Sequence, residues 1–224
     1  MLSIWGVSYG NDDMTGIDSI GAFHKIGLYG NVDVLCRISA DSTGLIHFSN
    51  PKDRNLFYIT NRKGILTISV MQEFEGKHDL PVIEVFTDSL SSVENSYDRM
   101  LEIRGTVISD SFKTKQQGNG VITIDNLRAD KVSLSSTAGK GKIKILSGTC
   151  SSLSCKITGT GEIDARNLEA DNVSCRFFGG GKIVCNPLNK LSVFGIGSTK
   201  VYYTGNPKIR KFWNKCYRLE DKPN

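Results

Sequence analysis

The second half of the chain repeats one pattern of glycine and apolar residues about every 20 positions. Four segments read Gly-x-Gly-x-Ile, and their first glycines, Gly118, Gly139, Gly159 and Gly179, lie 21, 20 and 20 residues apart; a shorter copy begins at Gly195. A motif that recurs at a fixed period of this length is typical of stacked structural units, in which the last unit is atypical and acts as a cap.

Apolar residues stand at fixed distances from the first glycine of each copy. They alternate with polar residues, which is typical of strands that bury one face. No segment carries the helical spacing or the asparagine ladder of a leucine-rich repeat. The pattern therefore predicts an all-β, parallel β-solenoid (β-helix) with rungs of about 20 residues, stacked about 4.8 Å apart. The aligned apolar columns are Ile122, Ile143, Ile163 and Ile183; Ile124, Ile145, Ala165 and Cys185; Val132, Leu153, Val173 and Leu191; and Leu134, Cys155, Cys175 and Val193.

Two polar features fit the same register. Lys142, Glu162 and Lys182 stand three residues after the first glycine of successive copies. Stacking would place these opposite charges in contact, which is worth about 0.2–1 kcal/mol per pair. The glycines are predicted to turn the corners of the rungs, because a corner favours positive φ and leaves little room between layers. A phosphate-binding glycine loop would need a helix after the glycines, and a strand pattern follows each copy instead.

Residues 1–104 also alternate like strands, but without the regular glycines. Val32–Ile38, Ile65–Val70 and Pro81–Phe86 are predicted strands, and polar turn segments separate them. The polar run Ser109–Gln117 is expected to be an exposed loop and a domain boundary, unless strand stacking continues across it. The predicted organisation is an N-terminal cap or lead-in (1–20), an irregular β-rich first half of the solenoid (21–108), regular repeats (109–207) and a basic, aromatic tail (208–224).

The C-terminal tail mixes five cations with three aromatic residues within Lys208–Arg218. We expect the tail to cap the solenoid, because an open end exposes the last core layer and an unpaired strand edge. Binding of single-stranded nucleic acid or of an anionic surface is the alternative for this segment.

Composition narrows the class of protein further. The chain has 224 residues, with 28 Lys and Arg against 23 Asp and Glu and a net charge of +5. This excess is mild and evenly spread along the sequence, so it indicates no nucleic-acid partner. No apolar run is long enough for a transmembrane helix. The first residues lack the basic and apolar regions of a secretory leader, so the chain is expected either to be cytoplasmic or to have lost a leader.

The six cysteines are the first candidates for chemistry. Cys155, Cys175 and Cys185 fall in apolar columns, where we expect buried, reduced thiols. Cys155 and Cys175 would stack nearly 5 Å apart, slightly beyond comfortable disulfide geometry. The three histidines are scattered and show neither metal-ligand spacing nor an arrangement that suggests a Ser-His-Asp site.

Paired carboxylates would indicate a carbohydrate-active β-helix enzyme. Asp125 and Asp164 would stack only across an intervening rung, and the same holds for Asp130 and Asp171. Two rung spacings are about 10 Å, which exceeds the range of about 6.5–9.5 Å in inverting glycosidases. We therefore expect no catalytic residue, no cofactor and no metal site.

Several segments together resemble a known family. Leu127–Asp130 and Leu168–Asp171 follow the glycine motifs, Phe23–Val34 opens the β pattern and Val201–Pro207 closes it. Over about residues 20 to 210, this series is similar to the putative auto-transporter adhesin head domain, or GIN domain, common in Bacteroidetes. The resemblance implies a right-handed, usually exported β-helix, and right-handed crossovers are also the general preference. The chain departs from the family in its missing leader, its many cysteines and the loss of Gly-x-Gly in Asp88–Arg104.

These observations lead to a functional expectation. We expect a non-enzymatic binding or adhesion module that presents an extended lateral surface to a glycan or protein ligand. An intracellular scaffold or assembly module is the alternative, and a carbohydrate-active enzyme is less favoured. The resemblance implies the cell surface, whereas the missing leader favours the cytoplasm; ligand and oligomeric state stay open. Hydroxyl-bearing positions that could contact the ligand are Ser133, Ser135, Ser152 and Ser154.

Overall fold

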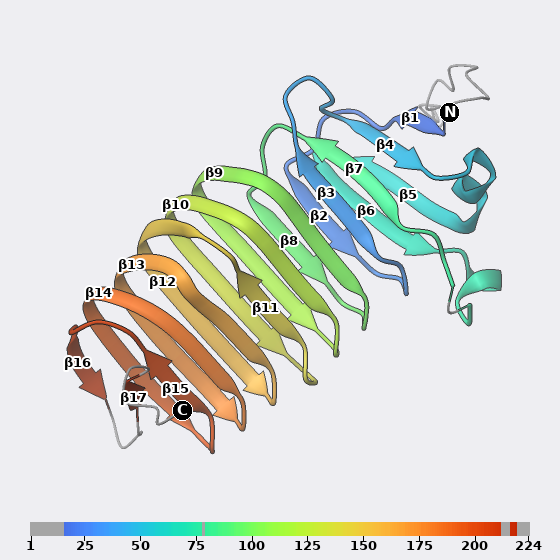
Figure 1. Cartoon of the computed structure of the whole chain (residues 1–224). Coiled ribbons are helices and arrows are strands. Elements are labelled where there is room, and N and C mark those ends of the chain that lie inside the picture. Colours follow the sequence, from blue (N-terminus) through green and yellow to red (C-terminus); the bar gives the residue numbers. More distant parts are fainter. Residues whose placement is uncertain (1–15, 78, 212–215, 219–224) are drawn as a thin grey trace, which may run out of the picture.

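The structure is a computed structural model that describes residues 16–77, 79–211 and 216–218. Its elements are β1 (Ile17–Ser19), β2 (Lys25–Leu28), β3 (Val34–Ile38), β4 (Leu45–Phe48), the 3-10 helix η1 (Pro51–Leu56), β5 (Phe57–Arg62), β6 (Ile65–Val70), the 3-10 helix η2 (Gln72–Phe74), β7 (Ile83–Thr87), β8 (Ser92–Asn95), β9 (Met100–Gln117), β10 (Val121–Thr137), β11 (Lys142–Ile145), β12 (Gly148–Gly159), β13 (Glu162–Gly179), β14 (Lys182–Ile196), β15 (Lys200–Tyr203), β16 (Lys208–Lys211) and β17 (Cys216–Arg218). The strands stack into a β-solenoid of about six turns, which confirms the predicted fold. β1 lies at one end of the solenoid and β16 at the other (Figure 1). Within the described residues, no helix is long and apolar enough to span a membrane.

Each regular rung contributes two long faces and one short face. Four long strands, β9, β10, β13 and β14, bend so that their first part lies on one long face and their last part on the other. Face A consists of β7, β3, 100–104, 121–125, β11, 162–165, 182–185 and β15. Face B consists of β6, β2, β8, 111–117, 131–137, 152–159, 172–179, 190–196 and β16. The short face consists of 105–110, 126–130, 146–151, 166–171 and 186–189.

The predicted apolar columns lie in register inside the solenoid. Ile122, Ile143, Ile163 and Ile183 pair as parallel neighbours on successive rungs, and none of them has any solvent exposure. In the shortened last copy, Leu191 takes the place that valine or leucine holds in the earlier copies. Full burial of one such side chain is worth about 1.5–3 kcal/mol, so these columns stabilise the register.

Glycine turns the chain from face B into the next rung, as predicted. Gly139, Gly159 and Gly179 have φ angles of 123°, 109° and 125°, a region that L side chains rarely adopt. The second glycine of each motif is required for a different reason. A Cβ atom on Gly161 would lie 2.0 Å from Oγ of Ser136 at the end of β10. The glycine columns therefore have a structural role at the corners.

The first half of the chain belongs to the same solenoid, but it is threaded out of sequence order. β2 lies between β6 and β8, and β3 lies between β7 and β9, so the first rung is inserted between two later ones. β1 and β5 pair antiparallel with β4 and β6 and form the edges at this end. Short or antiparallel edge strands of this kind hinder unwanted pairing with another chain.

The expectation of an exposed loop at Ser109–Gln117 is wrong. β9 runs through this segment, and its last part pairs with β8 and β10. Phe112, Thr114 and Gln116 point into the core with at most 2% exposure, and the two lysines between them lie outward. Because two of these three inward residues are polar, a search for alternating apolar residues misses the strand.

The described parts of the C-terminal tail add two strands to the last rung. β16 pairs with β14 and β17 pairs with β15, so both long faces gain a further strand at this end. Strand pairing thus continues into the tail, and the capping of the solenoid end stays a prediction. Phe212 and Trp213 of the predicted cap, His78 and residues 1–15 of the predicted lead-in lie outside the described residues.

Candidate binding surface

The carboxylates considered for catalysis are engaged in other contacts. Asp164 forms an ion pair with Arg166 at 2.8 Å. Its column runs through Lys144 to Thr123, so the expectation that Asp125 and Asp164 stack across an intervening rung is wrong. Asp125 accepts a hydrogen bond from the backbone N–H of Gly105 at 3.3 Å. In the part of the chain that the structure describes, no three His, Cys, Asp or Glu side chains are placed to hold a metal ion.

The second pair of carboxylates lies on the short face. Asp130 and Asp171 line a shallow groove of about 580 Å³, with Ser151 on the rung between them. Glu169 and Asp110 line the same groove. The short face is therefore acidic, and its carboxylates are spread over several rungs in solvent.

The five cysteines whose side chains the structure describes are buried and free, which confirms the burial predicted for Cys155, Cys175 and Cys185. Cys155 and Cys175 stack in register. Burial raises the pKa of the Cys36 thiol to about 12. Burial, assisted by the nearby Asp171 carboxylate, raises the pKa of Cys150 to about 11. Because the thiolate is the reactive form, these raised pKa values leave Cys36 and Cys150 poor nucleophiles at neutral pH.

Face A carries charges of both signs that neutralise one another. Glu162 lies between two lysines: its Oε1 is 2.9 Å from Nζ of Lys182, and its Oε2 is 3.7 Å from Nζ of Lys142. This confirms the alternation of charge predicted from the sequence. The other ion pairs of this face are Arg37 with Glu84, Arg104 with Glu102, and Asp164 with Arg166 of the adjoining short face.

Face B carries charges of one sign only from β9 to β16. Its six strand segments there, 111–117, 131–137, 152–159, 172–179, 190–196 and 208–211, contain no Asp or Glu. Lys115 reaches back to Glu94 of β8 at 2.8 Å. This half of face B is therefore strongly basic although the net charge of the whole chain is only +5. Its nine cations are Lys113, Lys115, Lys131, Lys156, Arg176, Lys190, Lys208, Arg210 and Lys211.

Several of these cations lack an anionic partner and stack on one another. Lys156 pairs in register with Arg176, and Lys190 with Lys208. Like charges directly opposite each other in a sheet are destabilising. Among the described residues, seven cations of face B have no ion-pair partner: Lys113, Lys131, Lys156, Arg176, Lys190, Lys208 and Lys211.

A row of hydroxyl groups runs through the middle of this basic surface. Ser133, Ser154, Ser174 and Ser192 follow one another at the same position of four successive rungs. We call this row the serine column. Of the hydroxyl positions expected to contact a ligand, the structure thus places two in one column, while Ser135 and Ser152 stand in the columns on either side.

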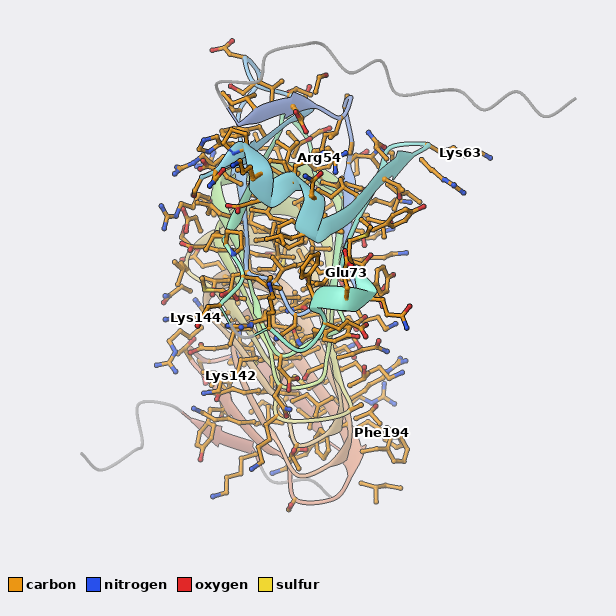
Figure 2. All side chains as sticks on the ribbon, turned by 90° about the vertical axis from the view of Figure 1, so that its right-hand side faces the viewer. Arg54, Lys63, Glu73, Lys142, Lys144 and Phe194 are labelled. Atoms are coloured by element: carbon orange, nitrogen blue, oxygen red, sulfur yellow. The ribbon has the colours of Figure 1, made fainter. Side chains whose placement is uncertain are left out.

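The C-terminal corner of face B exposes three large apolar side chains. Phe178, Phe194 and Ile196 are 55%, 53% and 64% exposed, and we call them the apolar corner. Phe178 and Ile196 are direct cross-strand neighbours. A groove of about 410 Å³ lies beside Phe194 and Arg176. Figure 2 shows Phe194 on the opposite side of the solenoid from Lys142 and Lys144 of face A.

The sequence interpretation missed this basic surface because it considered only the distribution of cations along the chain. That distribution is even. In space the fold sorts the cations by face, and the net charge of the whole chain does not reveal this. The signal was present in the repeats: the positions 13 to 20 residues after Gly118, Gly139 and Gly159 carry lysine or arginine but no carboxylate, as at Lys131, Lys156 and Arg176. Reading charge by position within the repeat would have found it.

A solenoid with an acidic short face, a neutral face A and a basic face B belongs to the class of repetitive β proteins with extended surfaces. The chain is a member of the family described as putative auto-transporter adhesin, head GIN domain, whose model matches residues 22–207. This confirms the resemblance inferred from the sequence. A search of curated proteins finds no match to the chain.

Solved structures of Bacteroidetes proteins share the fold. A putative adhesin from Bacteroides fragilis NCTC 9343 is 20% identical, with a TM-score of 0.77, and the alignment covers 95% of this chain and 98% of that one. A putative adhesin from Parabacteroides merdae ATCC 43184 is 19% identical, with a TM-score of 0.67 and coverage of 93% and 95%. A putative lipid binding protein from Parabacteroides distasonis ATCC 8503 is 17% identical, with a TM-score of 0.65 and coverage of 94% and 98%.

Proposed function

We propose that this protein is a non-enzymatic binding or adhesion module and that the part of face B from β9 to β16 is its ligand surface. The observation that carries the proposal is the two stacked pairs of cations without anionic partners, Lys156 with Arg176 and Lys190 with Lys208. Folding alone gives no reason for Lys156 to lie against Arg176, because the contact between like charges lowers stability. A ligand that brings negative charge or many hydrogen-bond acceptors would relieve this repulsion.

The architecture suits binding through many weak contacts. The backbone of face B is held on both sides by parallel strand pairing, so its side chains present a preorganised array. Repeated weak contacts to an extended ligand add up because each new contact becomes intramolecular after the first. The family and its solved relatives carry the names of adhesins or binding proteins, which supports the same class of function.

The apolar corner favours a lipid surface as a second candidate ligand. Phe178, Phe194 and Ile196 are exposed next to Arg176, and apolar side chains flanked by cations are typical of proteins that dock on anionic membranes. One solved relative of the same fold bears the name of a lipid binding protein, which supports this candidate.

The proposal is tested by binding panels with two matched variants. The face B variant, Lys156→Gln/Arg176→Gln, removes two exposed cations from face B, and the face A variant, Lys144→Gln/Lys200→Gln, removes two exposed cations from face A. Purified protein is tested by biolayer interferometry against immobilised glycans, matrix proteins and lipid vesicles.

We expect the face B variant to lose binding to whichever panel member the native protein binds, and the face A variant to keep it. Equal loss in both variants, or loss in the face A variant alone, would contradict the assignment of the ligand surface. Cleavage of any glycan in the panel would contradict the non-enzymatic part of the proposal.

A further inference from the structure

The outward side chains of face B form three parallel columns along the solenoid axis. The serine column occupies the middle, and it is continued by Lys113 on β9 and by Arg210 on β16, so a cation stands at each end. The two flanking columns lie two residues to either side on the same strands. The first flanking column is Ser111, Lys131, Ser152, Asn172, Lys190 and Lys208, and the second is Lys115, Ser135, Lys156, Arg176 and Phe194.

These columns define a strip with the dimensions of one extended polymer. Four residues of strand separate the flanking columns, which corresponds to about 13 Å. Five rung steps separate β9 from β16, which corresponds to about 24 Å along the axis. The strip has cations on both sides and hydroxyl groups along the middle, and no acidic side chain interrupts it.

We propose that this strip binds a linear polyanionic glycan, one that carries carboxylate or sulfate groups, along the axis of the solenoid. The inference rests on the proposed function and names the class of its ligand. Lysine and arginine side chains of the flanking columns pair with the anionic groups of the polymer. Serine hydroxyls, which both donate and accept hydrogen bonds, contact the sugar hydroxyls between them.

The placement of the apolar residues favours a glycan over a membrane. A membrane-docking face needs apolar side chains that enter the lipid. On face B from β9 to β16, the large exposed apolar residues are Phe178, Phe194 and Ile196, and Ile209 on the last strand. The strip from β9 to β12 has none, although it contains Lys113, Lys131 and Lys156. At a membrane, this part of the basic strip would contribute only electrostatic attraction to lipid headgroups, without any side chain that enters the lipid.

The same strip lacks the features that nucleic-acid surfaces use. Single-stranded nucleic acid binds through aromatic side chains on which successive bases stack, and no outward aromatic residue stands on β9, β10 or β12 within face B. Duplex DNA is read by elements that enter a groove, and this part of face B is formed by strands of one parallel sheet. Charge complementarity along a row of hydroxyls fits a charged polysaccharide better.

The experiment uses a matched pair of polymers, dextran sulfate and neutral dextran of equal length, with polygalacturonate as a carboxylated polymer. Binding to the native full chain is measured by isothermal titration calorimetry at 50 and 300 mM NaCl. We expect dextran sulfate and polygalacturonate to bind and dextran not to bind. The affinity should fall by about tenfold or more at the higher salt concentration, because charge pairing is screened and counterions are released.

The two variants decide whether the strip or the net charge is responsible. The face B variant should bind dextran sulfate about tenfold more weakly, whereas the face A variant, which loses the same charge, should stay within about twofold of native affinity. Equal weakening in both variants overturns the inference, provided that their thermal unfolding matches the native protein. Tighter binding of phosphatidylglycerol vesicles or duplex DNA than of either anionic polymer also overturns it.

The outcome separates this inference from the proposed function. If a neutral glycan or a protein from the panel binds and only the face B variant loses it, while dextran sulfate does not bind, the polyanionic ligand is wrong and the ligand surface stands. If the face A variant loses every panel ligand and the face B variant loses none, both the inference and the proposed surface are wrong.

Discussion

Faces A and B are built from successive parts of the same rungs and cover the same core, yet their charges are arranged in opposite ways. On face A, Glu162 lies between Lys142 and Lys182 and neutralises both. On face B of the same rung, Arg176 stacks on Lys156 of the preceding rung with no carboxylate between them. The inward columns fix the register of both faces, so the fold itself allows either arrangement. The charges of face A therefore stabilise the fold, whereas the like charges of face B carry a cost in stability that the proposed binding function would explain.

The largest expected effect comes from breaking the core that both faces share. Ile163 has no solvent exposure and pairs with isoleucines on both adjacent rungs. Ile163→Asp buries a charge without a partner, which we expect to cost more than about 4 kcal/mol and to unfold the repeats. Thermal unfolding followed by circular dichroism measures this loss. Thr158→Asp, on the exposed surface of face B, is the control, and an unchanged melting curve for Ile163→Asp would refute the column assignment.

Alkaline pH should weaken the same core through its thiols. Burial raises the pKa of Cys36, which lies under face A, from 9.0 to about 12. The unfolded thiol loses its proton near pH 9, whereas the folded thiol keeps it. The free energy of unfolding therefore has its full value below pH 9 and falls as the pH rises toward 12. For Cys36 the loss amounts to about 4 kcal/mol over that range. Urea unfolding between pH 7 and 11 measures how steeply the free energy of unfolding falls with pH. The Cys36→Ala variant, although less stable at neutral pH, should show a shallower fall. An identical slope in native protein and variant would contradict this origin.

A corner glycine joins face B to face A of the next rung and should be less tolerant than a surface glycine. Gly179 has φ of 125°, and a Cβ atom there would lie 2.4 Å from the carbonyl oxygen of Gly159. We expect Gly179→Ala to destabilise the protein by about 2–3 kcal/mol, because it combines backbone strain with a clash. Gly76→Ala, where a Cβ meets nothing within 4 Å, should change stability by less than about 0.5 kcal/mol. Similar urea midpoints for both variants would argue against a strained corner.

The smallest effect tests the contrast between the two faces directly. Glu162→Gln removes the shared partner of Lys142 and Lys182, and we expect a loss of about 0.5 kcal/mol because the pairs are partly exposed. Lys156→Gln should leave stability unchanged or raise it slightly, because it removes repulsion from Arg176. Urea unfolding at 20 and 500 mM NaCl measures both changes, which should shrink at the higher salt concentration. A loss of equal size for Lys156→Gln would mean that face B is stabilised by its charges after all.

The regular repeats could be predicted because each rung carries its own local evidence. The isoleucine column and the ion pairs of Glu162 follow directly from aligning residues on the first glycine of each copy. The segment of Thr114 and Gln116 could not be predicted in this way, because its inward residues are polar and their burial depends on neighbouring rungs. The insertion of β2 and β3 between later strands is also absent from any local pattern, since it depends on which distant strands pair.

The basic strip could be predicted from the sequence only in part. Every cation was visible in the sequence, but net charge averages over faces and hides a surface of one sign. Only the assignment of Lys156 and Arg176 to the same column makes the repulsion between them apparent. The charge of a repeat protein should therefore be read by column.

The most direct test of the account is a lysine footprint on the native chain. Acetylation of each lysine is followed by mass spectrometry with and without dextran sulfate. We expect Lys131, Lys156 and Lys190 of face B to react several times more slowly in the presence of the polymer, and Lys144 and Lys200 of face A to react at an unchanged rate. Equal protection on both faces, or protection of face A alone, would contradict the claim that face B is the ligand surface.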